Sequence, residues 1–250
     1  YPDMKATEGE AFSMNALKTE NAKLQAAVKS RTIELENKSR ELELESSLEK
    51  VRAQALGMRK SEDLLDICHT LYNELGKLGI TSLRNAVIHV FHDEQACFTD
   101  YEYSDSTGGH ITMLPYKGDL TLEKFIKRIK KSEKAFVELK VEGKEFENWK
   151  SFRKKTGQIN DTRLKQAKAI HYYIYSVGNA SIGISSFDTV EKDKKELLKR
   201  FRNVFDLAYK RYTDITNAEA QARDAQIEAG LERVRSRSLA MHKTGELQSV

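Results

Sequence analysis

The chain has 250 residues, of which 32% are charged and 39% are hydrophobic, and its formal net charge is +4. Its 42 basic and 38 acidic residues are interspersed, which argues against a nucleic-acid-binding protein because such proteins need a clustered basic surface. Two cysteines are too few for a disulfide framework or a structural zinc site. No apolar run reaches the ~18 residues that span a bilayer. We expect a cytoplasmic, helix-rich chain of one or two domains without a metal or other cofactor, although a longer parent chain could carry a membrane anchor.

The sequence predicts a flexible lead-in over residues 1–13 and a long helix over residues 14–60. Apolar residues in this helix recur with alternating gaps of three and four, which is the spacing of a coiled-coil seam. After residue 42 the phase slips, and a second apolar stripe continues the helix on another face. A solvated single helix is the alternative, but the regular stripe favours a seam. The expected dimer seam comprises Leu17, Asn21, Leu24, Val28 and Leu35, followed by Leu48 and Val51.

The sequence predicts a compact α+β domain over residues 61–215. A first amphipathic helix over 61–79, continuous with the preceding one, leads into short β-patterned runs separated by turns rich in Gly, Asn and Asp. The expected strands are 85–91, 95–103, 110–115, 135–139, 169–177 and 181–187. The further expected helices are about 120–131, about 144–156 and a long one from about 191. Five or six strands in hairpins predict an antiparallel sheet with flanking helices covering one face.

One stretch of the chain occurs twice. LESSLEKVRAQALGMRKSEDLLDI (44–67) recurs 183 positions later as IEAGLERVRSRSLAMHKTGELQSV (227–250). The identical matching residues include Leu48 with Leu231 and Val51 with Val234. Self-similarity at a fixed spacing indicates a protein built from modules. We therefore expect residues 216–250 to be an exit helix that connects to a following module, with Leu231 and Val234 on its dimer seam.

Both copies carry a resemblance to a known class of protein. SLEKVRAQALGMRKSEDL (47–64) and GLERVRSRSLAMHKTGEL (230–247) resemble the linker that precedes GAF-like domains in bacterial sensor histidine kinases and nucleotide cyclases. Residues 181–229 are similar to the last strand and exit helix of such domains, and residues 17–42 resemble a signalling coiled coil. The resemblance implies a GAF/PAS-like sensor domain that dimerises through parallel helices and controls a distant output domain.

The resemblance does not extend to the catalytic parts of those proteins. His242 lacks the sequence context of a phospho-accepting histidine, and the chain has no glycine-rich ATP-binding pattern and no P-loop. It also lacks the Asn-Lys-x-x-x-Phe pattern of GAF domains that bind cyclic nucleotides. No nucleophile, base and orienting group form a recognisable set, so we expect this chain not to be an enzyme.

Aromatic residues are concentrated in the central domain. GAF-like domains bind small ligands between sheet and helices, and the polar tips of Tyr and His side chains could orient a ligand there. Ordinary core packing would explain the same residues. His89 and His171 lie in expected strands and could face the same space. The candidate pocket residues are Tyr103, Trp149, His171 and Tyr175.

Two functions fit these observations. The first is a sensory or signal-relay module, in which a ligand or movement of the entry helix shifts the packing of a helix pair. The second is a ligand-free structural spacer that holds two chains in register. The expected partners are a second copy of the chain, a small-molecule ligand and a downstream output domain in the same polypeptide, without nucleic acid or membrane.

Overall fold

The computed structural model describes the backbone of residues 3–247 and the side chains of residue 14 and residues 16–239. The chain divides into two compact units, Tyr1–Ser47 and Leu48–Val250. The first unit is the N-terminal part of helix α1 (Asp3–Gly57), and the second contains the end of α1 and all later elements. No described helix contains a stretch that is long and apolar enough to cross a membrane.

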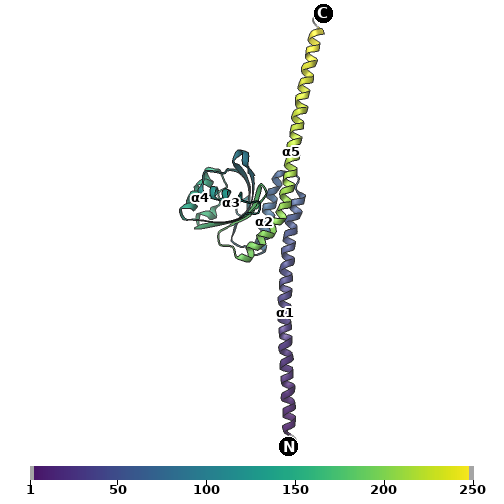
Figure 1. Ribbon diagram of the computed structural model, residues 1–250, viewed down its shortest axis with the longest axis vertical. Coiled ribbons are helices and arrows are strands. Elements are labelled where there is room, and N and C mark those ends of the chain that lie inside the picture. Colours follow the sequence, from purple (N-terminus) through teal and green to yellow (C-terminus); the bar gives the residue numbers. More distant parts are fainter. Residues whose placement is uncertain (1–2, 248–250) are drawn as a thin grey trace. The chain divides into compact units, whose positions relative to one another are not determined.

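The second unit is built around a six-stranded antiparallel sheet in the order β3-β2-β1-β6-β5-β4 (Figure 1). The first and last strands of the chain pair at its centre. The α+β prediction is confirmed, and each expected strand is present with ends shifted by a few residues. The strands are β1 (Leu83–His92), β2 (Cys97–Ser104), β3 (Gly108–Pro115), β4 (Phe136–Glu142), β5 (Ala169–Val177) and β6 (Ala180–Ser186).

Helices cover both faces of the sheet, whereas the sequence led us to expect cover on one face. Helices α2 (Leu64–Lys77) and α5 (Lys192–Leu247) lie on one side, and α3 (Leu120–Ile129) and α4 (Gly143–Lys155) lie on the other (Figure 1). The centre of the sheet is buried on both faces, as the burial of every residue of β6 shows. A strand without alternation of apolar and polar residues is typical of a sheet covered on both sides.

Helix α1 does not continue into the next helix as expected but ends at Gly57. A short 3₁₀ turn at Ser61–Asp63 then leads into α2. The Asp63 carboxylate accepts hydrogen bonds from the backbone N–H groups of Arg59 and Lys60, at 2.7 and 3.2 Å. The Asp63 side chain therefore stabilises a reversal of chain direction at a place where no proline in the sequence signals the end of a helix.

The end of α1 belongs to the core of the second unit. Leu48 is 4% exposed and Val51 is fully buried. Lys50 Nζ pairs with Glu74 Oε2 of α2 at 3.0 Å, and Arg211 of α5 donates to the Met58 carbonyl oxygen at 3.4 Å. The prediction that Leu48 and Val51 lie on a dimer seam is therefore wrong, because the chain's own core already covers both side chains.

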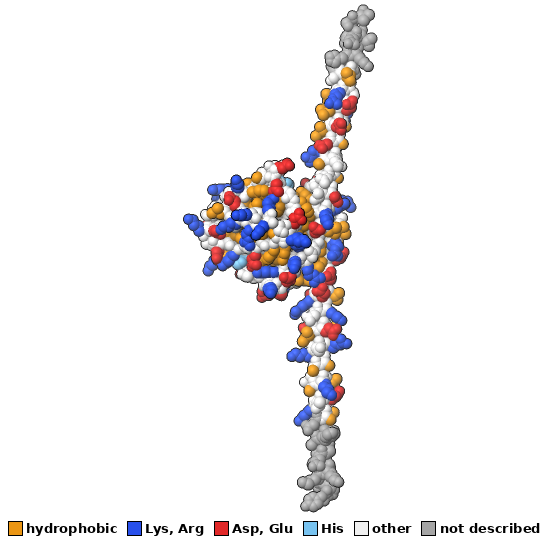
Figure 2. All heavy atoms as spheres, in the orientation of Figure 1, with side chains coloured by type: hydrophobic (Ala, Val, Ile, Leu, Met, Phe, Trp, Pro, Cys, Tyr) orange, Lys and Arg blue, Asp and Glu red, His pale blue; other side chains and the backbone are white. Residues whose placement is uncertain are grey.

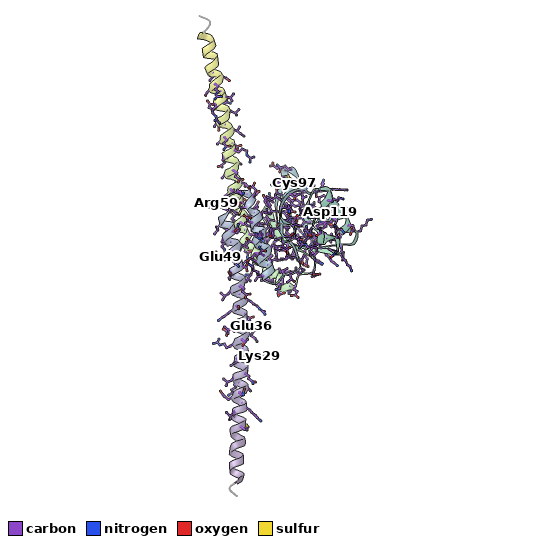
Figure 3. The ribbon with its side chains drawn as sticks, turned by 180° about the vertical axis from the view of Figure 1, so that it is seen from behind. Lys29, Glu36, Glu49, Arg59, Cys97 and Asp119 are labelled. Carbon is purple, nitrogen blue, oxygen red and sulfur yellow. The ribbon has the colours of Figure 1, made fainter. Side chains whose placement is uncertain are left out.

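In the first unit, α1 is helical from Asp3, so the helix includes most of the stretch 1–13 that we expected to be a flexible lead-in. Apolar side chains are exposed along this helix among charged ones (Figure 2). Lys29 and Glu36 project outward from it (Figure 3). The exposed apolar residues include the expected seam positions Leu17, Leu24, Val28 and Leu35. This stripe is available to a partner, and the dimer remains a prediction.

Candidate functional site

A cavity of about 70 Å³ lies between the sheet and helices α3 and α4. One water needs roughly 10–15 Å³ of such volume, so this space would hold about five waters or a small organic molecule. Its apolar wall consists of Val87, Phe98, Leu114, Leu122, Phe125, Leu139, Trp149, Phe152 and Ile174. Its polar wall consists of Arg84, Asn85, His89, Asp100, Glu102, Thr121, Arg153, Gln158 and Tyr172.

Glu102 is the most heavily bonded acid in this wall. Asn85 Nδ2 donates to Glu102 Oε2 at 2.6 Å, and the Arg84 guanidinium lies 3.5 Å from the same oxygen. Arg153 donates to Glu102 Oε1 at 3.3 Å. Burial alone would raise the pKa of Glu102, but the two guanidinium groups and Asn85 lower it overall. Glu102 is therefore a buried carboxylate that holds two arginines against the cavity.

Trp149 lies close to both arginines. The Arg84 and Arg153 guanidinium carbons are 5.6 and 5.2 Å from its ring centre, within the range of cation–π attraction. Trp149 and Arg153 share one face of α4 because they are four residues apart. Burial, and then the neighbouring Arg153, lower the pKa of Arg84. The aromatic ring thus helps to keep two like charges in a confined space.

Asp100 and His89 form the second polar group of the cavity. His89 Nε2 lies 3.5 Å from Asp100 Oδ1, and His89 Nδ1 is 2.8 Å from Ser181 Oγ. Burial and the nearby Glu102 raise the pKa of Asp100 to about 8, although Arg153 and Arg84 act in the opposite direction. Burial lowers the pKa of His89 to about 3. Near pH 7 both groups are therefore mainly uncharged.

Two polar atoms of the cavity wall lack a hydrogen bond. Within the described residues, Asp100 Oδ1 and Arg84 Nε are the buried side-chain atoms without a hydrogen-bond partner. Arg84 Nε makes an ionic contact with Asp161 Oδ2, at 3.4 Å. An unsatisfied buried polar atom costs about 1–3 kcal/mol, and native structures contain few of them. Their presence at one cavity indicates a place where a bound molecule could supply the missing partners.

A larger and more basic cavity adjoins this one. It has a volume of about 470 Å³, and Arg153 and Gln158 line both cavities. Arg153 donates to the side chain of Gln158 and, at 3.3 Å, to the Ile159 carbonyl oxygen. The remaining walls of the larger cavity include Lys150, Lys154, Asn160, Asp161, Leu164 and Lys165. Arg153 therefore lies between the larger, basic cavity and the smaller inner cavity.

Of the four pocket residues expected from the sequence, Trp149 lines the cavity and the other three do not. Tyr103 faces α2, where its ring centre is 4.3 Å from that of His69. Tyr175 stacks on Phe136 with ring centres 4.4 Å apart. The alternation along β5 places His171 and Tyr175 on the face opposite to Tyr172 and Ile174, which line the cavity. The expectation that His89 and His171 face the same space is therefore wrong, because the sheet separates them.

The cavity acids and arginines were missed at the level of sequence, although β2 carries a signal for them. Asp100 and Glu102 are two residues apart in a strand, which puts both carboxyl groups on one face. Two charged side chains on the same face of a buried strand are rare unless they are paired. The partner arginines lie at the start of β1 and the end of α4, so only the folded chain brings them to these acids.

Comparison with known proteins gives little guidance. No protein family matches the sequence, and no curated protein matches it. Among solved structures, the chain is similar to a crystal structure of a methyl-accepting chemotaxis protein, residues 122 to 287. The identity is 11% and the TM-score 0.41, over 67% of this chain and 98% of that one.

Proposed function

We propose that the chain is a sensory and signal-relay module of the GAF-like kind, which binds a small molecule in the inner cavity and passes the change to helix α5. The module acts as a binding protein and not as an enzyme, in the cytoplasm, as a dimer formed through the N-terminal part of α1. The observation that carries the proposal is the cavity between the sheet and helices α3 and α4, in whose wall Asp100 Oδ1 and Arg84 Nε are buried without hydrogen bonds.

The chemistry of the inner wall favours a ligand with an amino group. An ammonium group would give Asp100 Oδ1 its missing hydrogen bond, and the rings of Phe98 and Phe125 would offer it aromatic faces. Asp100 could ionise beside an ammonium group near pH 7 at a small cost, because its pKa of about 8 is not far above that pH. The volume suits a short chain of about five non-hydrogen atoms.

The fold offers a route from the cavity to α5. Tyr101 lies between Asp100 and Glu102 in β2, so its side chain points to the opposite face of the sheet. The Tyr101 hydroxyl lies close enough to that of Tyr212 on α5 that, besides burial, each group affects the pKa of the other. Any shift of β2 upon ligand binding would therefore act directly on α5, whose last buried described residue is Ile215.

A matched pair of probes tests the proposal. We expect n-butylamine to raise the melting temperature of the protein and n-butanol, its uncharged counterpart, to leave it unchanged. Asp100→Asn should abolish the response to the amine. Native mass spectrometry of the purified protein then reports the oligomeric state and any retained natural ligand.

The second candidate is a ligand-free spacer that holds two chains in register. The exposed stripe on the N-terminal part of α1 favours it, because that stripe alone would serve a dimer without any ligand. A dimer that retains no extra mass and responds equally to amine and alcohol would support the spacer and contradict the sensor.

A further inference from the structure

The two copies of the repeated sequence have opposite environments in the fold. In the first copy Leu48 is 4% exposed and Val51 is 0% exposed. Their counterparts in the second copy, Leu231 and Val234, are 54% and 63% exposed on α5, where apolar side chains lie open along the helix (Figure 2). The same apolar face is thus buried in the first copy and exposed in the second.

The copies also agree in what they leave exposed. Leu56 is 59% exposed and its counterpart Leu239 is 65% exposed. Leu56 is exposed in the first copy although the neighbouring apolar face is buried, and the second copy also has a leucine at that position. The second copy therefore keeps, in its sequence, both the buried and the exposed apolar positions of the first copy.

The first copy shows what covers such a face. The end of α1 packs within the second unit beside α2, and Lys50 Nζ forms an ion pair with Glu74 Oε2 of α2 at 3.0 Å. Arg233 occupies the position of Lys50 in the second copy, so the same basic charge is present there. The second copy can therefore make both the apolar and the ionic contact that the first copy makes.

We propose that the α5 face formed by Leu231, Val234 and Ser238 is a docking surface for another domain of this same fold, which contacts it through an amphipathic helix equivalent to α2. That helix would carry an acidic residue at the place of Glu74 to pair with Arg233. This assignment replaces the dimer seam that the heptad spacing led us to expect at Leu231 and Val234. It does not depend on a ligand in the cavity.

Self-pairing of two α5 helices through this face is the less favourable arrangement. Arg235 and Arg237 flank the stripe at the positions that face a partner helix in a parallel coiled coil. Acidic residues at those positions would be needed for favourable pairing between the two chains, and Ser238 replaces an apolar residue in the stripe itself. A domain surface with an acidic residue fits these charges better than a second α5.

A transplant of the second copy into the place of the first tests the proposal. Residues 48–58 become those of 231–241 through K50R, A53S, Q54R, A55S and G57A. We expect this variant to unfold cooperatively, with a melting temperature within about 5 °C of the wild type, because one buried Ala→Ser change is its main cost. The same variant with V51D added is the control and should lose cooperative unfolding. Loss of cooperative unfolding in the transplant itself would overturn the proposal.

The oligomeric state provides a second test that separates a docking surface from a dimer seam. We expect L231D with V234D to leave the sedimentation equilibrium of the wild-type protein unchanged. A shift toward a lighter species in this variant would overturn the proposal in favour of a seam. Neither result bears on amine binding, so the docking surface and the sensor function can fail separately.

Discussion

Gly183 of β6 lies so close to Tyr173 of β5 that a Cβ atom on the glycine would stand 2.1 Å from the tyrosine carbonyl oxygen. Backbone cannot give way by that amount without breaking the β5–β6 ladder, in which every residue of β6 is buried. The close approach depends on a glycine at this place and explains why the sheet tolerates a residue of low β-propensity there.

Gly183→Ala is therefore expected to abolish cooperative thermal unfolding, as measured by circular dichroism. Gly230→Ala is the matched control, since nothing lies within 4 Å of its Cβ position and it sits in α5. That variant should be stabilised by about 0.5–1 kcal/mol, because alanine favours a helix over glycine. Equal melting temperatures for the two variants would contradict the packing described here.

Glu102→Gln should lower the free energy of unfolding by about 3–5 kcal/mol, because it leaves two buried guanidinium groups without their shared carboxylate. Urea denaturation would measure the loss. Glu145→Gln, which breaks the exposed pair with Lys124, serves as the comparison and should cost no more than about 0.5 kcal/mol. A loss of that small size in Glu102→Gln would mean that the charges are not buried as a unit.

The stability of the protein should fall as the pH rises from about 6.5 to about 8. In this range folded Asp100 keeps a proton that the unfolded chain has already lost, so raising the pH favours unfolding, by at most about 1.4 kcal/mol per pH unit. His89 has the opposite effect, at lower pH. Its pKa is about 3 in the folded chain, so the folded state becomes more stable as the pH rises from there toward the ordinary pKa of histidine. Asp100→Asn should remove the decline above pH 6.5. An identical slope in both proteins would show that Asp100 ionises normally.

Tyr212→Phe should separate ligand binding from the response of α5. The change removes the hydroxyl that lies near that of Tyr101 and leaves the cavity on the other face of the sheet untouched. We expect n-butylamine to raise the melting temperature of this variant as in the wild type, while amide hydrogen exchange in residues 216–239 no longer changes on binding. An exchange response equal to that of the wild type would exclude the Tyr101–Tyr212 contact as the route.

Leu24→Asp should dissociate the dimer that we expect to form through the N-terminal part of α1. Leu24 is 59% exposed and lies on the seam, so an aspartate there would place two buried charges side by side in a coiled coil. Sedimentation equilibrium reports the change. Ile33→Asp alters an exposed residue of the same helix away from the seam and should have no effect. A monomeric wild-type protein would contradict the expected dimer.

The sequence by itself determined the order and type of nearly every element, because the apolar periodicity changes from helical to alternating at the places where the structure changes. It also located the phase slip in α1, and the boundary between the two compact units at Ser47 and Leu48 lies close to it. Apolar periodicity shows that one face of a helix will be buried, but it does not show which partner buries that face. The covering of Leu48 and Val51 by the chain's own core instead of a second chain was therefore decided by tertiary packing.

The cavity was likewise decided by tertiary structure. Spacing within β2 could have shown that Asp100 and Glu102 share a face, but not that Arg84 and Arg153 meet them from other elements. The register of β5 also decided between two aromatic faces of similar composition, and placed Tyr172 at the cavity and Tyr175 away from it. Local pattern fixes which residues lie together along one element, whereas contacts between distant elements depend on pairing and burial that only the folded chain defines.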